Sequence, residues 1–207
     1  KKYDEALEYQ YKVIDNLESK FENLDFIIDL STFTTAPKFG SNGVEDHISI
    51  GPLINEKAVR DVDELVQASL RAGAELVCGG HPHPLGDCFY QPTILNEVSS
   101  EMPVFRNEIF GPVAPLVRFS SEAEAISLAN DTEFGLAAYF YTRDIGRVWR
   151  VSEALDFGIV GINEGIISNE MAPFGGMKES GSGREGSKYG VDDYLEIKYI
   201  LMGGLDR

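Results

Sequence analysis

Cysteine is scarce in this chain of 207 residues, which holds only Cys78 and Cys88. Two thiols are too few for the disulfide framework of a secreted protein, so the composition favours a reducing compartment and we expect a cytoplasmic location. No apolar run reaches the roughly 18 residues that a membrane-spanning helix needs, and the charged first residues lack the apolar stretch of a secretion signal. We therefore expect no membrane partner.

Basic residues are also scarce relative to acidic ones. The chain has 18 Lys and Arg against 34 Asp and Glu, which gives a formal net charge of -16. Such a charge repels the phosphates of nucleic acids and of anionic lipids, so we expect neither as a partner. Hydrophobic residues at 43% and charged residues at 25% are ordinary for a globular protein, which excludes a disordered or collagen-like chain.

Hydrophobic periodicity predicts helices and strands in alternation. Helical spacing predicts helices over residues 2–22, 55–73, 121–130 and 144–155, with a glycine cap at 73 and a capping box at 121–124. Strand-like runs lie at residues 76–78, expected to be buried, and at 89–95, 113–119, 136–142, 158–163 and 194–200. The turn-rich stretch 23–46 is predicted to be an irregular connector. This order predicts the α/β class, with a parallel or mixed sheet and covering helices.

The segment 158–190 is different in kind, because nine of its 33 residues are glycine. Glycine at that density allows positive φ angles and close approach of the backbone to a ligand or to another backbone, and it is also typical of flexible linkers. The interleaved Phe174, Met177 and Tyr189 argue against a pure linker. We expect close approach here, and the residues alone leave open whether a ligand is involved.

Three motifs, in this order, resemble the aldehyde dehydrogenase superfamily. They are Asn-Glu-Ile-Phe-Gly-Pro at 107–112, Asn-Asp-Thr-Glu-Phe-Gly-Leu at 130–136 and Pro-Phe-Gly-Gly-Met-Lys-Glu-Ser-Gly at 173–181. Within the superfamily, segments 165–170 and 183–190 are most similar to succinate-semialdehyde dehydrogenases. The resemblance implies that residues 1–190 are a truncated catalytic domain with a divergent connector at 23–46. It also implies that residues 191–207 contain a C-terminal strand used for oligomerisation.

The resemblance assigns roles to five residues. Glu108 matches the carboxylate that holds the hydroxyls of the nicotinamide ribose, and Phe110 matches the aromatic residue beside the nicotinamide ring. Ser168 matches a serine that helps bind the distal carboxylate of the substrate, and Phe174 matches a wall of the aldehyde pocket. Glu185 matches a carboxylate on a proton path. Without the resemblance, Glu108 and Glu185 would be surface acids, Phe110 a core side chain and Ser168 a loop hydroxyl.

The resemblance also implies that the catalytic parts of the parent enzyme lie outside this sequence. In the family, the nucleophilic cysteine, the general-base glutamate and the domain that binds NAD or NADP all precede the segment that matches Lys1. An aldehyde dehydrogenase needs each of them, for attack on the aldehyde, for activation of water and for hydride transfer. We therefore expect no catalytic residue in this chain and no cofactor for the chain alone.

Neither cysteine of the sequence is a good substitute nucleophile. Cys78 ends a strand that is predicted to be buried, where a thiol has a raised pKa and little reactivity. Cys88 follows Asp87, whose negative charge disfavours the thiolate. His81 and His83 lie near both thiols in the sequence, but their spacing matches no common zinc site, so we expect no metal.

Two functions stay open. The first is a truncated aldehyde dehydrogenase-like protein, derived from an NAD(P)-dependent succinate-semialdehyde dehydrogenase and not redox-competent alone. The alternative is a stand-alone protein that reuses the substrate pocket, lined by Ser168, Phe174 and Met177, to bind a small carboxylated ligand or for a non-redox isomerisation or cyclisation. The divergent connector 23–46 keeps this alternative open. Either protein is expected to form a homo-oligomer through residues 194–200, an alternating strand near the end of the chain.

Overall fold

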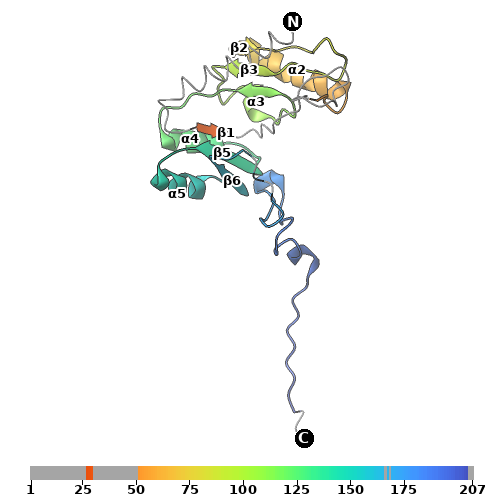
Figure 1. Cartoon of the computed structure of the whole chain (residues 1–207), viewed down its shortest axis with the longest axis vertical. Coiled ribbons are helices and arrows are strands. Elements are labelled where there is room, and N and C mark those ends of the chain that lie inside the picture. The colour runs from red at the N-terminus through yellow and green to blue at the C-terminus, as the bar shows by residue number, and fades with distance from the viewer. Residues whose placement is uncertain (1–26, 30–50, 166, 168, 205–207) are drawn as a thin grey trace.

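The computed structural model describes residues 27–29, 51–165, 167 and 169–204. Its helices and strands form two units, each built on a three-stranded sheet, and an extended C-terminal segment follows them (Figure 1). The α/β class is confirmed, with two mixed sheets in place of one. The predicted helix over 2–22 and most of the predicted connector 23–46 lie outside the described residues.

The first unit packs one long helix against the sheet β2-β3-β4. Its elements in chain order are α2 (Glu56–Arg71), β2 (Glu75–Cys78), β3 (Thr93–Asn96), the short α3 (Pro103–Arg106) and β4 (Val113–Pro115). Strand β3 is central, antiparallel to β2 and parallel to β4. The buried apolar side chains of this unit are Val59, Val62, Val66, Ala74, Tyr90, Leu95, Val98, Met102, Val104 and Val113.

Local signals explain both ends of α2. The side chain of Asn55 accepts a hydrogen bond from the backbone N–H of Ala58 at 2.9 Å, which caps the start of the helix. Gly73 follows the C-cap with φ at +109°, a conformation that glycine adopts without steric cost. The predicted glycine cap is therefore confirmed.

Strand β2 is exposed, so the prediction of a buried strand at 76–78 is wrong. Leu76 is 46% exposed and Val77 is 38% exposed. The physical reason is position in the sheet: β2 is an edge strand, paired only with β3 within the described residues. An apolar run of three residues does not distinguish an edge strand from a central one.

Other elements of the first unit differ from the prediction at their boundaries. The strand predicted over 89–95 begins only at Thr93, after Pro92, which has no N–H to donate to a sheet. The strand predicted over 113–119 ends at Pro115. The helix α3 was not predicted, because four residues are too few to show a helical period. No helix among the described residues is long and apolar enough to cross a membrane.

The second unit is built on the sheet β1-β5-β6. Its elements in chain order are β1 (Ile27–Asp29), α4 (Glu122–Asn130), β5 (Ala137–Tyr141), α5 (Ile145–Ala154) and β6 (Ile159–Ile162). Strand β5 is central, with β1 antiparallel and β6 parallel to it. The buried apolar side chains of this unit are Ala125, Ala129, Ala138, Phe140, Val151, Leu155 and Phe157.

Both helices of the second unit begin at capping side chains. Ser121 Oγ accepts a hydrogen bond from the N–H of Glu124 at 3.2 Å, and the carboxylate of Asp144 accepts one from the N–H of Arg147 at 3.0 Å. The carboxylate of Glu124 accepts from the N–H of Ser120, one residue before the position that a capping box uses. The N–H of Ser121, which is the position that a capping box uses, also bonds to this carboxylate, so the predicted capping box is confirmed with an additional bond from Ser120.

Strand β1 corrects the prediction of a wholly irregular connector at 23–46. Residues 27–29 pair with β5, in a register that joins Ile28 to Phe140. Isoleucine is a residue type enriched in strands, and β5 offers an edge with unpaired backbone groups. Pairing of this kind joins residues more than a hundred positions apart, so a local pattern does not reveal it.

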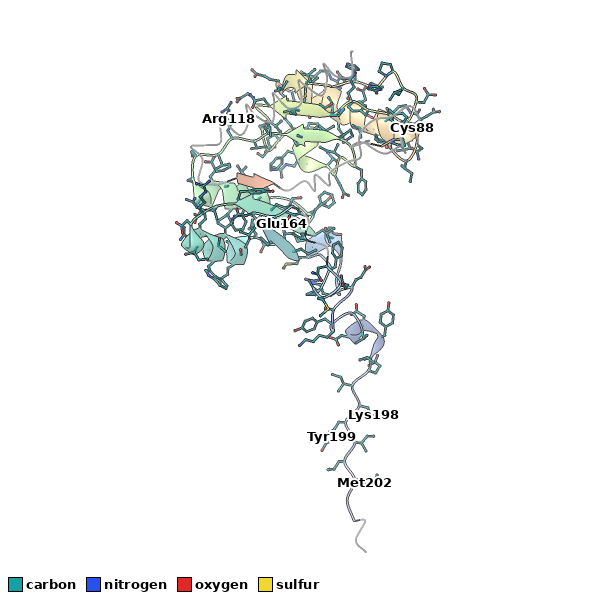
Figure 2. All side chains as sticks on the ribbon, in the orientation of Figure 1. Cys88, Arg118, Glu164, Lys198, Tyr199 and Met202 are labelled. Carbon is teal, nitrogen blue, oxygen red and sulfur yellow. The ribbon has the colours of Figure 1, made fainter. Side chains whose placement is uncertain are left out.

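The chain after the second unit contains two short 3-10 turns, η1 (Lys178–Ser180) and η2 (Asp192–Tyr194). Over residues 195–202 the backbone is extended and leads away from both units (Figure 1), and Figure 2 shows Lys198, Tyr199 and Met202 projecting along this segment. The prediction of a strand over 194–200 is therefore wrong for the described structure, because Tyr194 belongs to η2 and the residues after it form no strand. Residues 195–200 have no paired strand within the described part of the chain.

Candidate functional site

Glu108 and Phe110 lie on the loop between α3 and β4, and both side chains are exposed. Val104 in α3 donates its backbone N–H to the buried Ser69 Oγ at 3.1 Å, which fastens α3 to α2. Gly111 approaches the same helix so closely that a Cβ there would fall 2.6 Å from a side-chain methyl group of α2. The loop is therefore held on α2 at both ends, with the two predicted site residues between them.

Phe110 combines a strained backbone with an exposed aromatic ring. Its φ is +48°, which costs on the order of 1 kcal/mol for a residue with a Cβ. Its ring is 81% exposed, so the loop gains little from burial of a large apolar side chain. The ring is not part of the core, and a strained, exposed aromatic residue is typical of a ligand contact. The exposed carboxylate of Glu108 is accessible to hydroxyl donors.

Phe174 and Glu185 lie opposite each other in the glycine-rich segment 158–190. The N–H of Phe174 donates to the carbonyl of Glu185 at 2.9 Å, and the N–H of Glu185 donates to the carbonyl of Phe174 at 2.6 Å. Both side chains are exposed. The structure thus brings these two predicted site residues together through their backbones. Ser168, the predicted contact for the distal carboxylate, lies outside the described residues.

Close contacts between backbones explain several glycines of this segment. A Cβ on Gly158 would collide with the carbonyl oxygen of Gly175, and a Cβ on Gly175 would fall 2.6 Å from the carbonyl oxygen of Gly183. Arg184 crosses the same loop and donates to the carbonyls of Gly176 and Gly183 at 2.8 and 2.6 Å. At these positions the glycines serve approach to another part of the backbone, which answers the question that the sequence left open.

The turn 130–136, the second of the three motifs, receives the glycine-rich segment. The carbonyl of Gly135 accepts hydrogen bonds from the N–H groups of both Gly158 and Met177 at 2.9 Å. The N–H of Gly135 donates to Ser180 Oγ at 2.9 Å. A Cβ on Gly135 would fall 2.9 Å from the carbonyl oxygen of Met177, so this contact also requires glycine. The second and third motifs are therefore one structural unit.

An open pocket of about 440 Å³ lies within the glycine-rich segment. The residues that line it are Glu170, Met171, Pro173, Ser187, Lys188 and Tyr189. The N–H of Ser187 donates to the carbonyl of Glu170 at 3.0 Å, which joins the two sides of the pocket. Phe174 and Met177, expected to line a cavity if the chain acts as a stand-alone binding protein, do not line this pocket.

Burial disfavours Cys78 as a nucleophile. Burial raises the pKa of Cys78, whose Sγ lies 3.8 Å from the carbonyl of Pro92. Cys88 lies in the first unit (Figure 2), in the loop between β2 and β3, where its carbonyl accepts a hydrogen bond from the N–H of Leu53 at 2.7 Å. Burial lowers the pKa of His83. Over the described part of the chain, no group of three His, Cys, Asp or Glu side chains could hold a metal ion.

Two asparagines that hold the site loops were not singled out from the sequence. Asn163, at φ +55° after β6, accepts from the N–H of Thr142 and donates to its carbonyl, both at 2.8 Å. Asn130, at the end of α4, donates to the carbonyl of Ala154 at 2.7 Å and accepts from the N–H of Asp156 at 2.9 Å. The available signal was asparagine at the end of an element, where it tolerates positive φ and its amide replaces a backbone partner.

Comparison with known proteins supports the family resemblance that the three motifs indicate. Residues 21–200 match the aldehyde dehydrogenase family. Over 162 residues the chain is 61% identical to the NADP(+) succinate-semialdehyde dehydrogenase of Escherichia coli (strain K12), covering 78% of this chain and 34% of that protein. Over 166 residues it is 60% identical to the 3-sulfolactaldehyde dehydrogenase of Pseudomonas putida, covering 80% and 34%. A crystal structure of succinate-semialdehyde dehydrogenase from Burkholderia pseudomallei is similar with a TM-score of 0.76 and 59% identity, covering 79% and 34%.

The fold and the three motifs therefore define an aldehyde dehydrogenase-type α/β architecture, and this chain belongs to the aldehyde dehydrogenase family. The predicted resemblance to succinate-semialdehyde dehydrogenases is confirmed at the level of homology. The chain spans about one third of the length of the curated relatives that it matches.

Proposed function

We propose that this chain supplies the nicotinamide-side and substrate-loop part of an NAD(P)-dependent dehydrogenase for a short aldehyde with an anionic group at its other end. The observation that carries the proposal is Phe110, an exposed ring on a strained backbone beside Glu108, on a loop fastened to α2. The names of the relatives support the substrate class, because succinate semialdehyde and 3-sulfolactaldehyde are both short aldehydes with an anionic group.

The exposed residues of the first unit fit the nicotinamide half of a dinucleotide. The carboxylate of Glu108 can accept hydrogen bonds from two ribose hydroxyls, and the ring of Phe110 offers an apolar face to a flat ring. NAD or NADP held there would supply the hydride acceptor. The contacts with its pyrophosphate and adenosine would come from residues outside this chain, so the chain alone should bind a dinucleotide weakly.

The glycine-rich segment is proposed as the substrate side. Phe174 would form a wall of the aldehyde pocket, and Ser168 would donate its hydroxyl to the distal carboxylate. The exposed carboxylate of Glu185, held opposite Phe174 by two backbone hydrogen bonds, would relay a proton to solvent. A small carboxylated ligand is therefore the proposed partner.

The 207 residues are proposed to be a truncated form that does not oxidise an aldehyde alone. Attack on an aldehyde needs a thiolate, and the sequence offers only Cys78 and Cys88. Burial raises the pKa of Cys78, which disfavours its thiolate. The nucleophile and the general base would come from the part of the relatives' length that this chain does not span.

The extended C-terminal segment is proposed to pair with a second copy of the chain. Ile197 is 101% exposed and Tyr199 is 82% exposed, and the backbone of residues 195–202 has no strand partner within the described part of the chain, so it offers edges to a sheet. Light scattering tests this proposal: we expect an oligomer, and a monomer after Ile197→Lys. A monomeric parent chain at high protein concentration would contradict it.

The scarcity of thiols supports a cytoplasmic location.

A chimera tests the proposed function. Residues 51–207 would replace the matching third of the Escherichia coli relative, so that the remaining two thirds supply the missing parts. We expect the chimera to form NADPH from succinate semialdehyde. The substitutions Glu108→Gln and Phe174→Ala should reduce the rate. The control Arg118→Gln, a change at an exposed ion pair, should leave the rate unchanged. A folded chimera without activity would contradict the proposal. So would NADPH formation by the 207-residue chain that disappears in Cys78→Ser or Cys88→Ser.

A further inference from the structure

Two cations that are distant in the sequence meet at the C-terminal end of α4. Arg106, two residues before Glu108, places Nη1 3.3 Å from the carbonyl oxygen of Asp131 and Nη2 3.0 Å from its carboxylate. Lys178, in the glycine-rich segment, places Nζ 3.1 Å from the carbonyl oxygen of Asn130 and 3.2 Å from that of Thr132. Three consecutive residues of the turn thus receive both side chains.

The physical chemistry of a helix end explains why both cations lie there. The last carbonyls of a helix have no intrahelical donor and carry the negative end of the helix dipole. In α4 these are the carbonyls of Asn130 and its neighbours, and Asp131 adds a full negative charge. The N–H donors of Arg106 and Lys178 satisfy these acceptors and compensate the charge.

The backbone around Lys178 is fixed as well as its amine. Its φ is +55°, a conformation that a residue with a Cβ adopts only when its surroundings hold it there. Glu179 donates its N–H to the carbonyl of Glu133 at 3.0 Å, and Nζ of Lys178 lies 5.3 Å from the centre of the Phe157 ring. The amine of Lys178 is therefore anchored to a buried ring and to the turn together.

We propose that Arg106 and Lys178 are positioning residues that hold the nicotinamide-side loop and the substrate loop at a fixed separation across the end of α4. Arg106 connects the turn to Glu108 and Phe110, and Lys178 connects it to Phe174. This inference rests on the proposed function for its catalytic consequence, but not for its structural one. Loss of either cation lets one loop move relative to the other, while both hydrophobic cores stay intact.

Kinetics of the chimera test the catalytic consequence. We expect Arg106→Gln and Lys178→Gln each to lower kcat about fivefold, with a smaller change in KM, because loss of a charge contact at a helix end lowers the population of the held loop by about this factor. Arg106→Lys and Lys178→Arg should restore most of the rate, because they keep a cation at each place. Glu101→Gln is the matched control, since it removes the other carboxylate partner of Arg106 and leaves the contact with Asp131. Equal losses for Lys178→Gln and Lys178→Arg would overturn the proposal.

Backbone hydrogen exchange in the 207-residue chain tests the structural consequence without any activity. We expect Lys178→Gln to speed exchange at the N–H groups of Phe174 and Glu185 and to leave the N–H groups of β5 unchanged. Lys178→Gly, which relieves the positive φ but removes the amine, should do the same. Unchanged exchange at Phe174 and Glu185 overturns the proposal even if the chimera is active, and so does faster exchange throughout the chain. Faster exchange confined to the loop supports it even if the chimera is inactive, in which case only the proposed function fails.

Discussion

The first unit and the glycine-rich segment are held in opposite ways, although each presents a predicted site residue. The first unit is held by large side chains: Tyr90 and Leu95 are fully buried in its core. The glycine-rich segment is held by backbone against backbone, with Gly158 against Gly175 and the N–H of Met177 on Gly135. The difference indicates that the position of Phe110 depends on core packing, whereas the position of Phe174 depends on glycines whose lack of a side chain allows close contact between backbones.

Removal of a core side chain should have the largest effect, and it should be confined to the first unit. Leu95→Ala removes a fully buried side chain from the central strand β3, and we expect a loss of about 3 kcal/mol in the free energy of unfolding. Urea denaturation measures the loss, and hydrogen exchange locates it. Leu195→Ala, at a side chain that is 64% exposed, is the control and should change stability very little. Equal destabilisation of the second unit would contradict the separation of the two regions.

Addition of a single methyl group should destabilise the glycine-rich segment, just as removal of a side chain destabilises the first unit. Gly158→Ala forces a Cβ against the carbonyl of Gly175, and we expect a loss of about 2 kcal/mol, as overpacking commonly causes. Exchange should accelerate at Phe174 and remain slow in α2. Gly203→Ala is the matched control, because no atom lies within 4 Å of its added Cβ. A stable Gly158→Ala variant with unchanged exchange would show that this contact is not required.

Elements with local signals could be predicted from the sequence, whereas those that depend on tertiary contacts could not. The helices α2, α4 and α5 begin at Asn55, Ser121 and Asp144, whose side chains bond to an N–H only three residues away. Strand β1 and the exposure of β2 depend on pairing with distant strands or on the lack of it. Helix α3 is too short for any period.

The same distinction applies to the candidate site. Glu108 and Phe110 were identified only through the resemblance of a motif, since an isolated phenylalanine is more often a core residue. The meeting of Arg106 and Lys178 joins residues 72 positions apart at one helix end, so no spacing rule could have found it. The close approach of the backbones of Gly158 and Gly175 is also a tertiary contact that no spacing rule reveals. Glycine density alone indicated that close approach occurs, but not what is approached.

The smallest expected effect concerns a charge cluster that ties α4 to α5 in the second unit. Glu122 accepts from Nε of Arg150 at 3.0 Å and from Nε of Arg147 at 2.9 Å, and these bonds lower the pKa of Glu122 from 4.5 to about 2. A carboxylate whose pKa is lowered on folding stabilises the folded state above its unfolded pKa. That stabilisation is lost as the pH falls from 4.5 towards 2.

Denaturation of the chain and of Glu122→Gln over this pH range checks the prediction. At neutral pH the variant should be less stable by about 1 kcal/mol, a modest value because the side chains are partly exposed to solvent. The difference should shrink as the pH falls from 4.5 to about 2, where about half of the parent carboxylate is protonated in the folded state. Glu153→Gln, at an exposed position on α5, should follow the parent chain at every pH. A stability difference that stays constant between pH 4.5 and 2 would mean that the two arginines do not act through the charge of Glu122, and that this unit is held by packing alone.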